Sequence, residues 1–189
     1  ILEMDLMNDQ IEYLDESSFA GCTRLQRLFI YGNFIERIPA GVFRNNPNLE
    51  VLNLGNNQLR RQDLPPSLFA GTALRTLDLS NNPLRDFDPN WLAPLTATLR
   101  ELNIFANGFE SLPLDAFVSV PNLHTLSMGD NPLSDLPTGI FNPLTSLEVF
   151  TLGNCRLRTL NPEWFISLRN LTHFHVPGNQ LIDLSVGIF

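Results

Sequence analysis

The chain has 189 residues, of which 43% are hydrophobic, and its net charge is −8, with twelve arginines and no lysine. It contains no run of about 18 apolar residues, so we expect no transmembrane segment within it. The acidic balance also argues against nucleic acid as a partner, because that affinity depends on cations that neutralise phosphates.

A single sequence pattern recurs along the whole chain. In the stretch from Leu123 to Phe141 it has the form LxxLxLxxNxL, followed by LPxxxF. Aligned on the first apolar position, eight units begin at Ile1, Leu25, Leu49, Leu74, Leu99, Leu123, Leu147 and Leu171. A period of about 24 residues with this pattern is the signature of a leucine-rich repeat. The sequence therefore predicts one α/β-type repeat solenoid over residues 1–189, a leucine-rich repeat horseshoe whose terminal caps are not visible.

The third to seventh positions of each unit predict a short β-strand. Apolar residues at the fourth and sixth positions alternate with variable residues, and this period of two places the apolar side chains on one buried face. Equivalent strands of successive units would pair in parallel, because each unit buries its apolar face only by stacking on the next. We expect this parallel sheet to form the concave face, with short turns and 3-10 segments on the convex face.

The ninth position carries asparagine in most units, at the point where the chain is predicted to leave the strand and turn inward. A buried amide can both donate and accept hydrogen bonds, so it can satisfy the backbone groups of such a bend. We predict a structural ladder formed by Asn33, Asn57, Asn82, Asn107, Asn131, Cys155 and Asn179. Cys155 is a structural substitution in this interpretation, because a buried thiol is usually inert.

The second half of each unit predicts a buried aromatic column on the convex side. Its expected members are Phe19, Phe43, Phe69, Phe117, Phe141, Phe165 and Phe189. In the fourth unit Leu92 takes this position and Trp91 precedes it. The third unit is irregular because its Leu64 comes two residues late, and we expect a local bulge at Arg60–Asp63 on the convex or lateral face.

The two cysteines, Cys22 and Cys155, are too far apart in the predicted solenoid to pair. Five or more strand spacings of about 4.8 Å separate them, whereas a disulfide requires Cα atoms within about 7 Å. Cys22 either bridges to a cap outside this chain or remains a free thiol, and the sequence leaves both interpretations open. Asn170 begins the sequence Asn-Leu-Thr, a glycosylation acceptor that favours an extracellular protein.

The variable strand positions predict the ligand-binding surface, because alternate residues of a strand point to the same side. Phe29 and Tyr31 are expected to face outward on one strand, and aromatic side chains are enriched at binding hot spots. The predicted ligand-binding residues of the concave face are Phe29, Tyr31, Asn53, Asp78, Glu101, Asn103, Phe105, His173 and His175. Small residues are expected to leave room for the ligand at Gly55, Gly129 and Gly153.

His173 and His175 share one face of the last predicted strand. They could bind a metal, form a pH-sensitive contact surface, or be plain exposed residues. The metal is the least favoured, because the neighbouring Val149 and Thr151 are poor ligands, and we expect neither a metal nor a cofactor. No nucleophile, base or carboxylate pair follows a catalytic spacing, so we expect that the chain is not an enzyme.

The repeat pattern resembles the typical class of animal extracellular leucine-rich repeats, which includes Toll-like receptors, Slit-type guidance proteins and variable lymphocyte receptors. The turns IPAGVF at 38–43 and LPTGIF at 136–141 are similar to the LPxGVF turns of the variable lymphocyte receptors. The resemblance implies a secreted or cell-surface location and recognition of an innate-immune type. The concave face would then hold a microbial surface component, a carbohydrate or a protein ligand.

Two other interpretations remain open. The chain could be a noncatalytic structural or assembly subunit, or a matrix or adhesion protein, that binds one protein partner. It could also form a homodimer through the concave face, which would cover the same aromatic side chains.

Overall fold

The computed structural model describes residues 1–188, so Phe189, the last predicted member of the aromatic column, lies outside the described residues. Within residues 1–188, eight strands form one parallel sheet in chain order. The strands are β1 (Glu3–Asp5), β2 (Arg27–Phe29), β3 (Val51–Asn53), β4 (Thr76–Asp78), β5 (Glu101–Asn103), β6 (Thr125–Ser127), β7 (Val149–Thr151) and β8 (His173–His175). The same residues contain the 3-10 helices η1 (Arg61–Asp63), η2 (Pro89–Trp91), η3 (Ala93–Leu95) and η4 (Pro162–Trp164).

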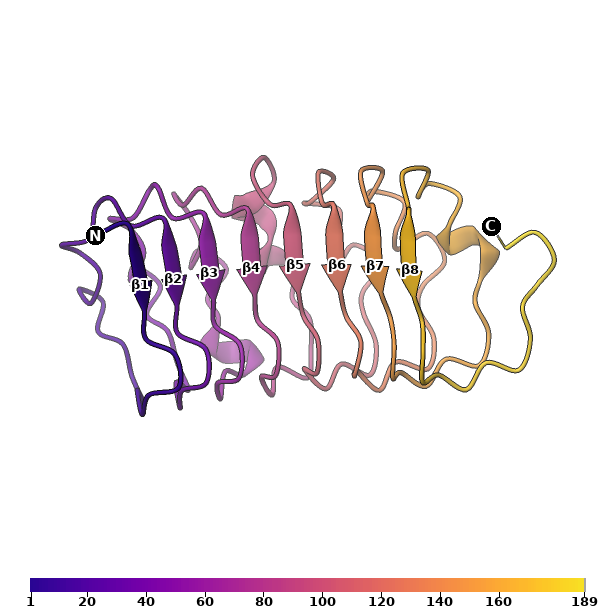
Figure 1. The fold of residues 1–189 in the computed structure, drawn as a ribbon, viewed down its shortest axis with the longest axis horizontal. Helices are drawn as coiled ribbons and strands as arrows, with labels where there is room; N and C mark the ends of the chain where they lie inside the picture. Colours follow the sequence, from indigo (N-terminus) through magenta and orange to yellow (C-terminus); the bar gives the residue numbers. More distant parts are fainter. Residues whose placement is uncertain (189) are drawn as a thin grey trace.

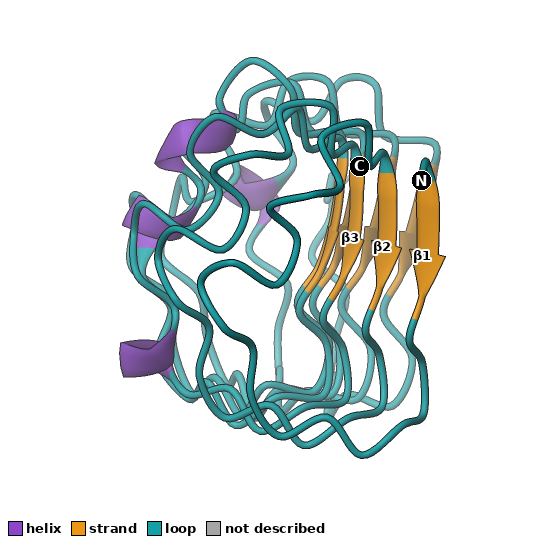
Figure 2. Cartoon of the chain, turned by 90° about the vertical axis from the view of Figure 1, so that its left-hand side faces the viewer, coloured by secondary structure: helices purple, strands orange, loops and turns teal. Residues whose placement is uncertain are grey.

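The eight strands lie side by side along the long axis, and the chain runs from one end of the stack to the other (Figure 1). Seen from its end, the molecule has the sheet on one side and the short helices on the opposite side (Figure 2). This arrangement confirms the predicted leucine-rich repeat solenoid. We call the outward-facing side of the sheet the sheet face; it is the surface predicted as the concave face.

The register of the sheet keeps equivalent positions of successive units next to each other. Leu52 pairs with Leu28 on one side and with Leu77 on the other, and all three side chains are completely buried. Burial of one such side chain contributes about 1.5–3 kcal/mol. Stability therefore comes from the stacking of neighbouring units, since no unit could enclose its own apolar face.

Buried phenylalanines form most of the predicted column behind the sheet. The rings of Phe19 and Phe43 stack with their centroids 5.9 Å apart, and those of Phe117 and Phe141 stack at 6.0 Å. Phe69 is also buried. These stacked rings fill the wide part of the core between the sheet and the outer turns.

The fourth and seventh units fill this column in a different way. Asp88 and Asn161 each accept a hydrogen bond from the first turn of a 3-10 helix that starts with proline. This turn directs Trp91 and Trp164 inward, where each is only 1% exposed. The prediction that Phe165 is a buried member was wrong: it is half-buried, because Trp164 takes the core position beside it.

The irregularity predicted at Arg60–Asp63 corresponds to η1. The backbone N–H of Arg60 donates to the carboxylate of Asp63 at 3.3 Å, which closes the turn on itself. No residue of η1 is buried, so the extra length of this unit projects from the solenoid without changing its core.

The ninth-position asparagines join neighbouring units through hydrogen bonds. Nδ2 of Asn57 donates to the carbonyl oxygens of Ile30 and Leu54, both at 3.0 Å. Its Oδ1 accepts from the backbone N–H of Ile35, an eleventh-position residue of the preceding unit, at 3.1 Å. The same acceptor role recurs at Asn33, Asn82, Asn131 and Asn179.

A proline at the tenth position explains why cysteine can stand in this ladder. After Pro132, the backbone N–H of Leu133 donates to the carbonyl of Asn131 in its own unit, at 2.7 Å. That N–H therefore needs no acceptor from the next unit, where the ninth residue is Cys155. The Cys155 Sγ instead donates to a backbone carbonyl two residues earlier, at 3.5 Å. The unit that contains Pro83 has the same local turn.

The eighth position adopts a left-handed backbone in every unit, a requirement that the sequence pattern did not reveal. Its φ angle lies between +52° and +73° at Asn8, Gly32, Asn56, Asn81, Ala106, Asp130, Asn154 and Gly178. Glycine has no Cβ, and asparagine and aspartate tolerate this region through local hydrogen bonds. Ala106 has neither advantage, so the fifth unit carries backbone strain there.

Candidate ligand-binding site

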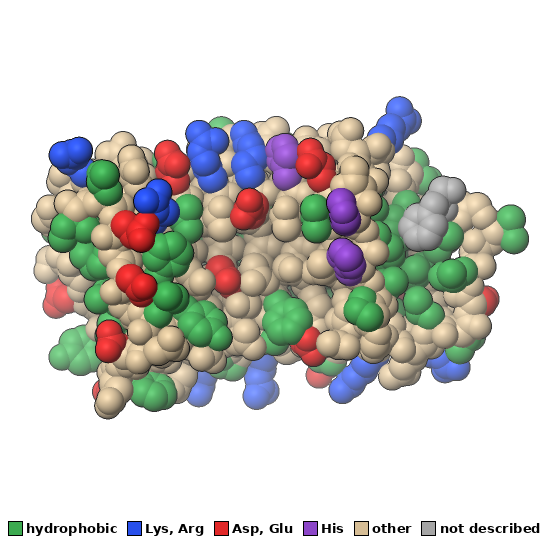
Figure 3. Space-filling view, in the orientation of Figure 1, with side chains coloured by type: hydrophobic (Ala, Val, Ile, Leu, Met, Phe, Trp, Pro, Cys, Tyr) green, Lys and Arg blue, Asp and Glu red, His purple; other side chains and the backbone are tan. Residues whose placement is uncertain are grey.

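The sheet face carries side chains from the third, fifth and seventh positions of each unit. Figure 3 shows it as a broad surface on which hydrophobic and acidic groups concentrate toward the N-terminal half, whereas two neighbouring histidines lie toward the C-terminal half. The exposed ion pair between Arg27 and Glu3, at 2.5 Å, crosses from β2 to β1 on this side. A pair with both partners this exposed contributes little to stability.

Four fifth-position side chains are fixed by the same local hydrogen bond. An Oδ1 atom accepts the backbone N–H two residues further on, at 2.8–3.1 Å, in Asp5, Asn53, Asp78 and Asn103. The predicted polar contacts Asn53, Asp78 and Asn103 therefore use one oxygen for their own strand. In the described part of the chain, Nδ2 of Asn53 and of Asn103 has no hydrogen bond, and these amides remain available to a ligand.

Phe29, Tyr31 and Phe105 are half-buried, whereas we expected them to face solvent. The reason is clearest at Tyr31, whose ring lies against the next unit. A Cβ added to Gly55 would come within 3.0 Å of Cδ2 of Tyr31 and within 2.9 Å of Oγ of Ser80. The aromatic ring is thus seated on the sheet with one face covered.

The glycines of the seventh position do not provide open space, so that expectation was wrong. Gly55 is buried, and Tyr31 occupies the volume above it. A Cβ on Gly129 would lie 2.7 Å from the carbonyl oxygen of Gly153, and a Cβ on Gly153 would lie 3.1 Å from Pro177. Glycine is required here because neighbouring backbones approach each other closely.

The middle strands of the sheet, β4 to β7, carry mainly polar side chains on the sheet face, including Glu101. Oγ1 of Thr76 donates to the carboxylate of Glu101 at 3.3 Å, and the hydroxyl groups of Ser127 and Thr151 lie 2.7 Å apart. These contacts link β4 to β5 and β6 to β7. They hold the polar side chains in defined positions without burying them.

His173 and His175 are both exposed on β8, and their rings are nearly parallel with centroids 6.3 Å apart. Nδ1 of His173 lies 2.9 Å from Oγ1 of Thr172. Among residues 1–188, no group of three or more His, Cys, Asp or Glu side chains could hold a metal ion. Six strand spacings, or about 29 Å, separate β8 from β2, so one small ligand cannot contact both the histidines and Phe29.

Two exposed apolar residues in the first two units escaped the sequence prediction. Met7 precedes Tyr31 by one unit at the same position and is 40% exposed, and Phe34 follows Tyr31 in the turn and is 49% exposed. The backbone N–H of Asn8 donates to the carbonyl of Tyr31 at 2.8 Å, which holds the two turns together. We call Met7, Phe29, Tyr31 and Phe34 the apolar patch. The signal was present, since Phe34 occupies a tenth position that carries polar residues, glycine or proline in the other units.

The remaining predicted residues lie away from the sheet face. Asn170 is exposed, and its Nδ2 donates to the carbonyl of Thr145 at 2.7 Å, a single bond that leaves the side chain at the surface. Cys22 is half-buried and Cys155 is buried, and within residues 1–188 they do not form a disulfide with each other. Burial raises the pKa of the Cys155 thiol, which keeps it protonated at neutral pH.

Comparison with known proteins identifies the repeats and shows proteins to which the chain is similar. The leucine rich repeat family model matches residues 2–59 and 121–181, and a model of two leucine rich repeats matches residues 47–94. Osteomodulin of Bos taurus is 28% identical over 189 residues, which is all of this chain and 42% of osteomodulin. The transforming growth factor beta activator LRRC32 of Mus musculus is 32% identical over 186 residues, 93% of this chain and 27% of that protein.

Among solved structures, the complex of TLR13 with ssRNA13 superimposes with a TM-score of 0.83 and 28% identity, covering 92% of this chain and 24% of the TLR13 chain. The chain thus spans less than half of the length of each of these proteins. No helix in residues 1–188 is long and apolar enough to cross a membrane.

Proposed function

The chain belongs to the leucine-rich repeat family, in its extracellular class, and on this basis we propose that it is a recognition module that binds a protein ligand on its sheet face. The observation that carries the proposal is the apolar patch. Two of its side chains are exposed, two are half-buried, and exposed carboxylates belong to the first of its two units. A folded domain gains nothing by exposing such residues together, whereas binding surfaces use them as anchors.

The charges around the apolar patch indicate the ligand's character. Glu3, Asp5 and Asp9 are exposed within the same two units, and Arg27 is already paired with Glu3. An apolar centre with an acidic border fits a protein surface that presents an apolar side chain next to lysine or arginine. The chain's net charge of −8 favours the same kind of partner.

The mechanism is recognition by a surface that is already ordered. Tyr31 is held against Gly55, and Asn53 and Asn103 are fixed by hydrogen bonds to their own strands. Binding then requires little loss of side-chain freedom, which otherwise costs about 0.5–1.5 kcal/mol for each immobilised side chain. A catalytic role has no support in this arrangement, because the predicted residues are spread over an open sheet.

Relatives suggest two biological settings for such binding. Similarity to TLR13 and the turn sequences support an innate-immune receptor that holds a microbial component or a protein. Similarity to osteomodulin supports the alternative, a matrix-type protein that assembles with one partner. The structure of TLR13 contains a single-stranded RNA, but the acidic surface here opposes a similar ligand.

The test compares binding of the protein with binding of a Phe29→Ala/Tyr31→Ala variant. Both are applied to immobilised extracellular matrix proteins and to purified bacterial wall components. A Leu114→Ala/Val118→Ala variant is the matched control, because these side chains are apolar and exposed but lie outside the sheet face. Thermal unfolding confirms that each variant is folded.

We expect the protein to bind at least one of these probes and the Phe29→Ala/Tyr31→Ala variant to lose that binding, while the control keeps it. Binding to matrix proteins alone would favour the matrix role, and binding to wall components alone would favour the immune role. Equal binding by both variants would move the site away from the sheet face. Concentration-dependent self-association that the aromatic variant abolishes would instead indicate a homodimer.

A further inference from the structure

The third and fourth units form a second distinctive surface, outside the sheet face. They are the two units with 25 residues, from Leu49 to Ala73 and from Leu74 to Thr98, in a chain whose other complete units have 24. The additional residue of the third unit produces η1, and the fourth unit replaces the usual turn by η2 and η3. Among the complete units, the length of the repeat thus changes only in these two, which adjoin.

A cavity of about 1020 Å³ lies at this place. It is lined by Arg60, Arg61, Gln62, Leu64, Pro65, Pro66, Pro83, Leu84, Arg85, Asp86 and Asp88. Proline has a fixed φ angle, so three of the lining residues give rigid walls. The polar lining residues come from η1, from the residue that precedes it, and from the segment between β4 and η2.

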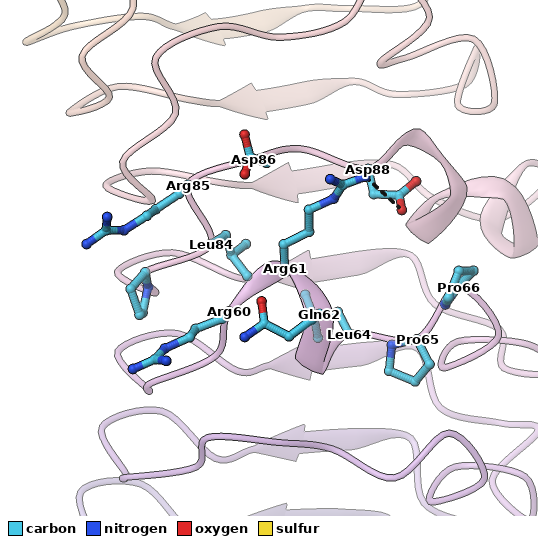
Figure 4. A pocket seen from close by; sticks show the side chains of 11 residues that line it. Arg60, Arg61, Gln62, Leu64, Pro65, Pro66, Leu84, Arg85, Asp86 and Asp88 are labelled. Atoms are coloured by element: carbon cyan, nitrogen blue, oxygen red, sulfur yellow. Dashed lines mark ion pairs between the residues drawn. The ribbon is translucent and has the colours of Figure 1, made fainter.

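Three arginines line this cavity, and their surroundings differ. Arg61 turns toward Asp88 and forms an ion pair at 3.7 Å. Arg60 and Arg85 extend together in the opposite direction, as Figure 4 shows. Within residues 1–188, neither of these two guanidinium groups has a carboxylate within ion-pair distance. Two unpaired arginines therefore stand side by side in a chain that is acidic overall.

The backbone at Arg85 is held in an unfavourable conformation. Its φ angle is +64°, in the left-handed region that residues other than glycine, asparagine and aspartate seldom adopt. The N–H of Arg85 donates to the carbonyl of Asn107 at 2.9 Å, and the N–H of Leu84 donates to that of Asn82 at 2.8 Å. These bonds and Pro83 impose the turn. Strain of this kind is concentrated at functional sites, and here it fixes the direction of one arginine.

Arg60 and Arg85 both occupy the twelfth position of their units, and the units on either side carry a negative charge at that position. The twelfth residues of the second to fifth units are Glu36, Arg60, Arg85 and Glu110, all exposed. At this twelfth position the order of charges is negative, positive, positive, negative. A long polyanion would meet carboxylates on both sides of the arginine pair, whereas a surface with the inverse order would be attracted at every position.

We infer that the lateral face, which is the surface that carries Glu36, Arg60, Arg85 and Glu110, docks a protein partner. This partner presents two neighbouring carboxylates flanked by basic side chains. Each guanidinium group would bind one carboxylate, in the paired geometry that arginine favours. Glu36 and Glu110 would attract the flanking cations and repel an uninterrupted acidic ligand. This docking is separate from ligand binding by the apolar patch, so one chain could hold two partners at once.

The experiment uses two helical peptides of identical composition. One carries Lys, Glu, Glu and Lys at four-residue intervals, which places these side chains along one face of the helix. Their spacing along the helix axis is about 6 Å, which is close to the spacing of about 4.8 Å between neighbouring strands of the solenoid. The other carries Glu, Lys, Lys and Glu at the same positions. Heparin serves as the polyanion. Binding of the protein to each probe is measured by fluorescence anisotropy at low ionic strength, where screening is weakest.

We expect the Lys-Glu-Glu-Lys peptide to bind about tenfold more tightly than the inverted peptide and heparin to bind no better than the inverted peptide. Arg60→Gln/Arg85→Gln should remove this preference, and Arg156→Gln/Arg158→Gln, which neutralises two exposed arginines of the seventh unit, should leave it unchanged. Equal binding of the two peptides, stronger binding of heparin, or no binding of any probe would overturn the proposal. Phe29→Ala/Tyr31→Ala should retain peptide binding, so this test and that of the sheet face can fail independently.

Discussion

The ring of Tyr31 lies over Gly55 of the next unit, so closely that a Cβ on Gly55 would come within 3.0 Å of Cδ2 of the ring. This contact joins the second and third units on the sheet face and determines how far the Tyr31 side chain projects from the sheet. It also shows that glycine at this position serves the neighbouring side chain rather than a ligand. The consequences of this contact can be tested by adding the missing methyl group.

Gly55→Ala should displace the Tyr31 ring and leave the sheet intact. The atoms that the new Cβ would meet, Cδ2 of Tyr31 and Oγ of Ser80, belong to side chains that can move. We expect a loss of about 1 kcal/mol in the free energy of unfolding, at the lower end of the cost of overpacking. Urea unfolding and near-UV circular dichroism measure the two effects. Gly21→Ala is the control, because a Cβ there meets nothing within 4 Å.

If the near-UV spectrum of Gly55→Ala were identical to that of the unmodified protein, the close contact between Tyr31 and Gly55 would be refuted. A change in the spectrum without loss of ligand binding would retain the contact but remove Tyr31 from the site.

Gly129→Ala should be much more disruptive than Gly55→Ala, although both glycines occupy the seventh position of a unit. Its Cβ would lie 2.7 Å from the carbonyl oxygen of Gly153, which is a backbone atom and cannot move without shifting β7. We expect a loss of about 3 kcal/mol, at the upper end of the cost of overpacking. The same urea titration ranks the two variants. Equal stability of the two would mean that the units can separate more easily than the structure indicates.

The sequence alone was sufficient to predict the repeat, the strands and the apolar core, because each depends on the periodic placement of residues such as Leu52 and Leu77. It was insufficient for features that depend on contacts between units. The half-burial of Tyr31 depends on the absence of a side chain at Gly55, and Trp164 displaces Phe165 because of a local 3-10 turn. Neither effect can be read from the pattern of a single unit.

Prediction of the candidate site from the sequence was limited in the same way. Selecting the outward strand positions identified Phe29 and Tyr31 but missed Phe34, which lies in the turn that follows. The use of Asn53 in a local hydrogen bond was also not foreseen, because the bond requires the backbone to curve back toward its side chain. The sequence therefore predicted which strand positions face outward, and the structure shows how their side chains are held.

Removing a ladder side chain should cost more at Asn57 than at Cys155. Asn57→Ala leaves the buried N–H of Ile35 without a partner and removes one of the donors to each of three carbonyl oxygens, with an expected loss of about 3 kcal/mol. Cys155→Ala removes only a weak S–H donor, because Leu133 bonds within its own unit, and should cost about 1 kcal/mol. Urea unfolding of both variants compares them, and a reversed order would refute the explanation based on Pro132.

Ala106→Asn should stabilise the protein. Ala106 has a φ angle of +53°, and the equivalent Asn56 and Asn81 adopt nearly the same angle. An alanine in the left-handed region costs about 1–2 kcal/mol, part of which asparagine recovers through local hydrogen bonding. We expect a gain of about 0.5–1 kcal/mol in the free energy of unfolding and a higher melting temperature. Ala106→Val, which is β-branched and should be less stable, provides the opposite control.

The raised pKa of the Cys155 thiol predicts a loss of stability at alkaline pH. Burial favours the neutral thiol in the folded chain, whereas an unfolded cysteine ionises near pH ~8.5. This contribution to stability is therefore fully present below about pH 8.5 and is lost as the pH rises toward the folded pKa. Unfolding free energies measured across the alkaline range should fall less steeply for Cys155→Ala than for the unmodified protein. Other groups also titrate there, but they are common to both proteins, so the difference reports the thiol. Parallel pH curves would show that Cys155 ionises as easily in the folded chain as in the unfolded one, and the buried environment assigned to its sulfur would then be incorrect.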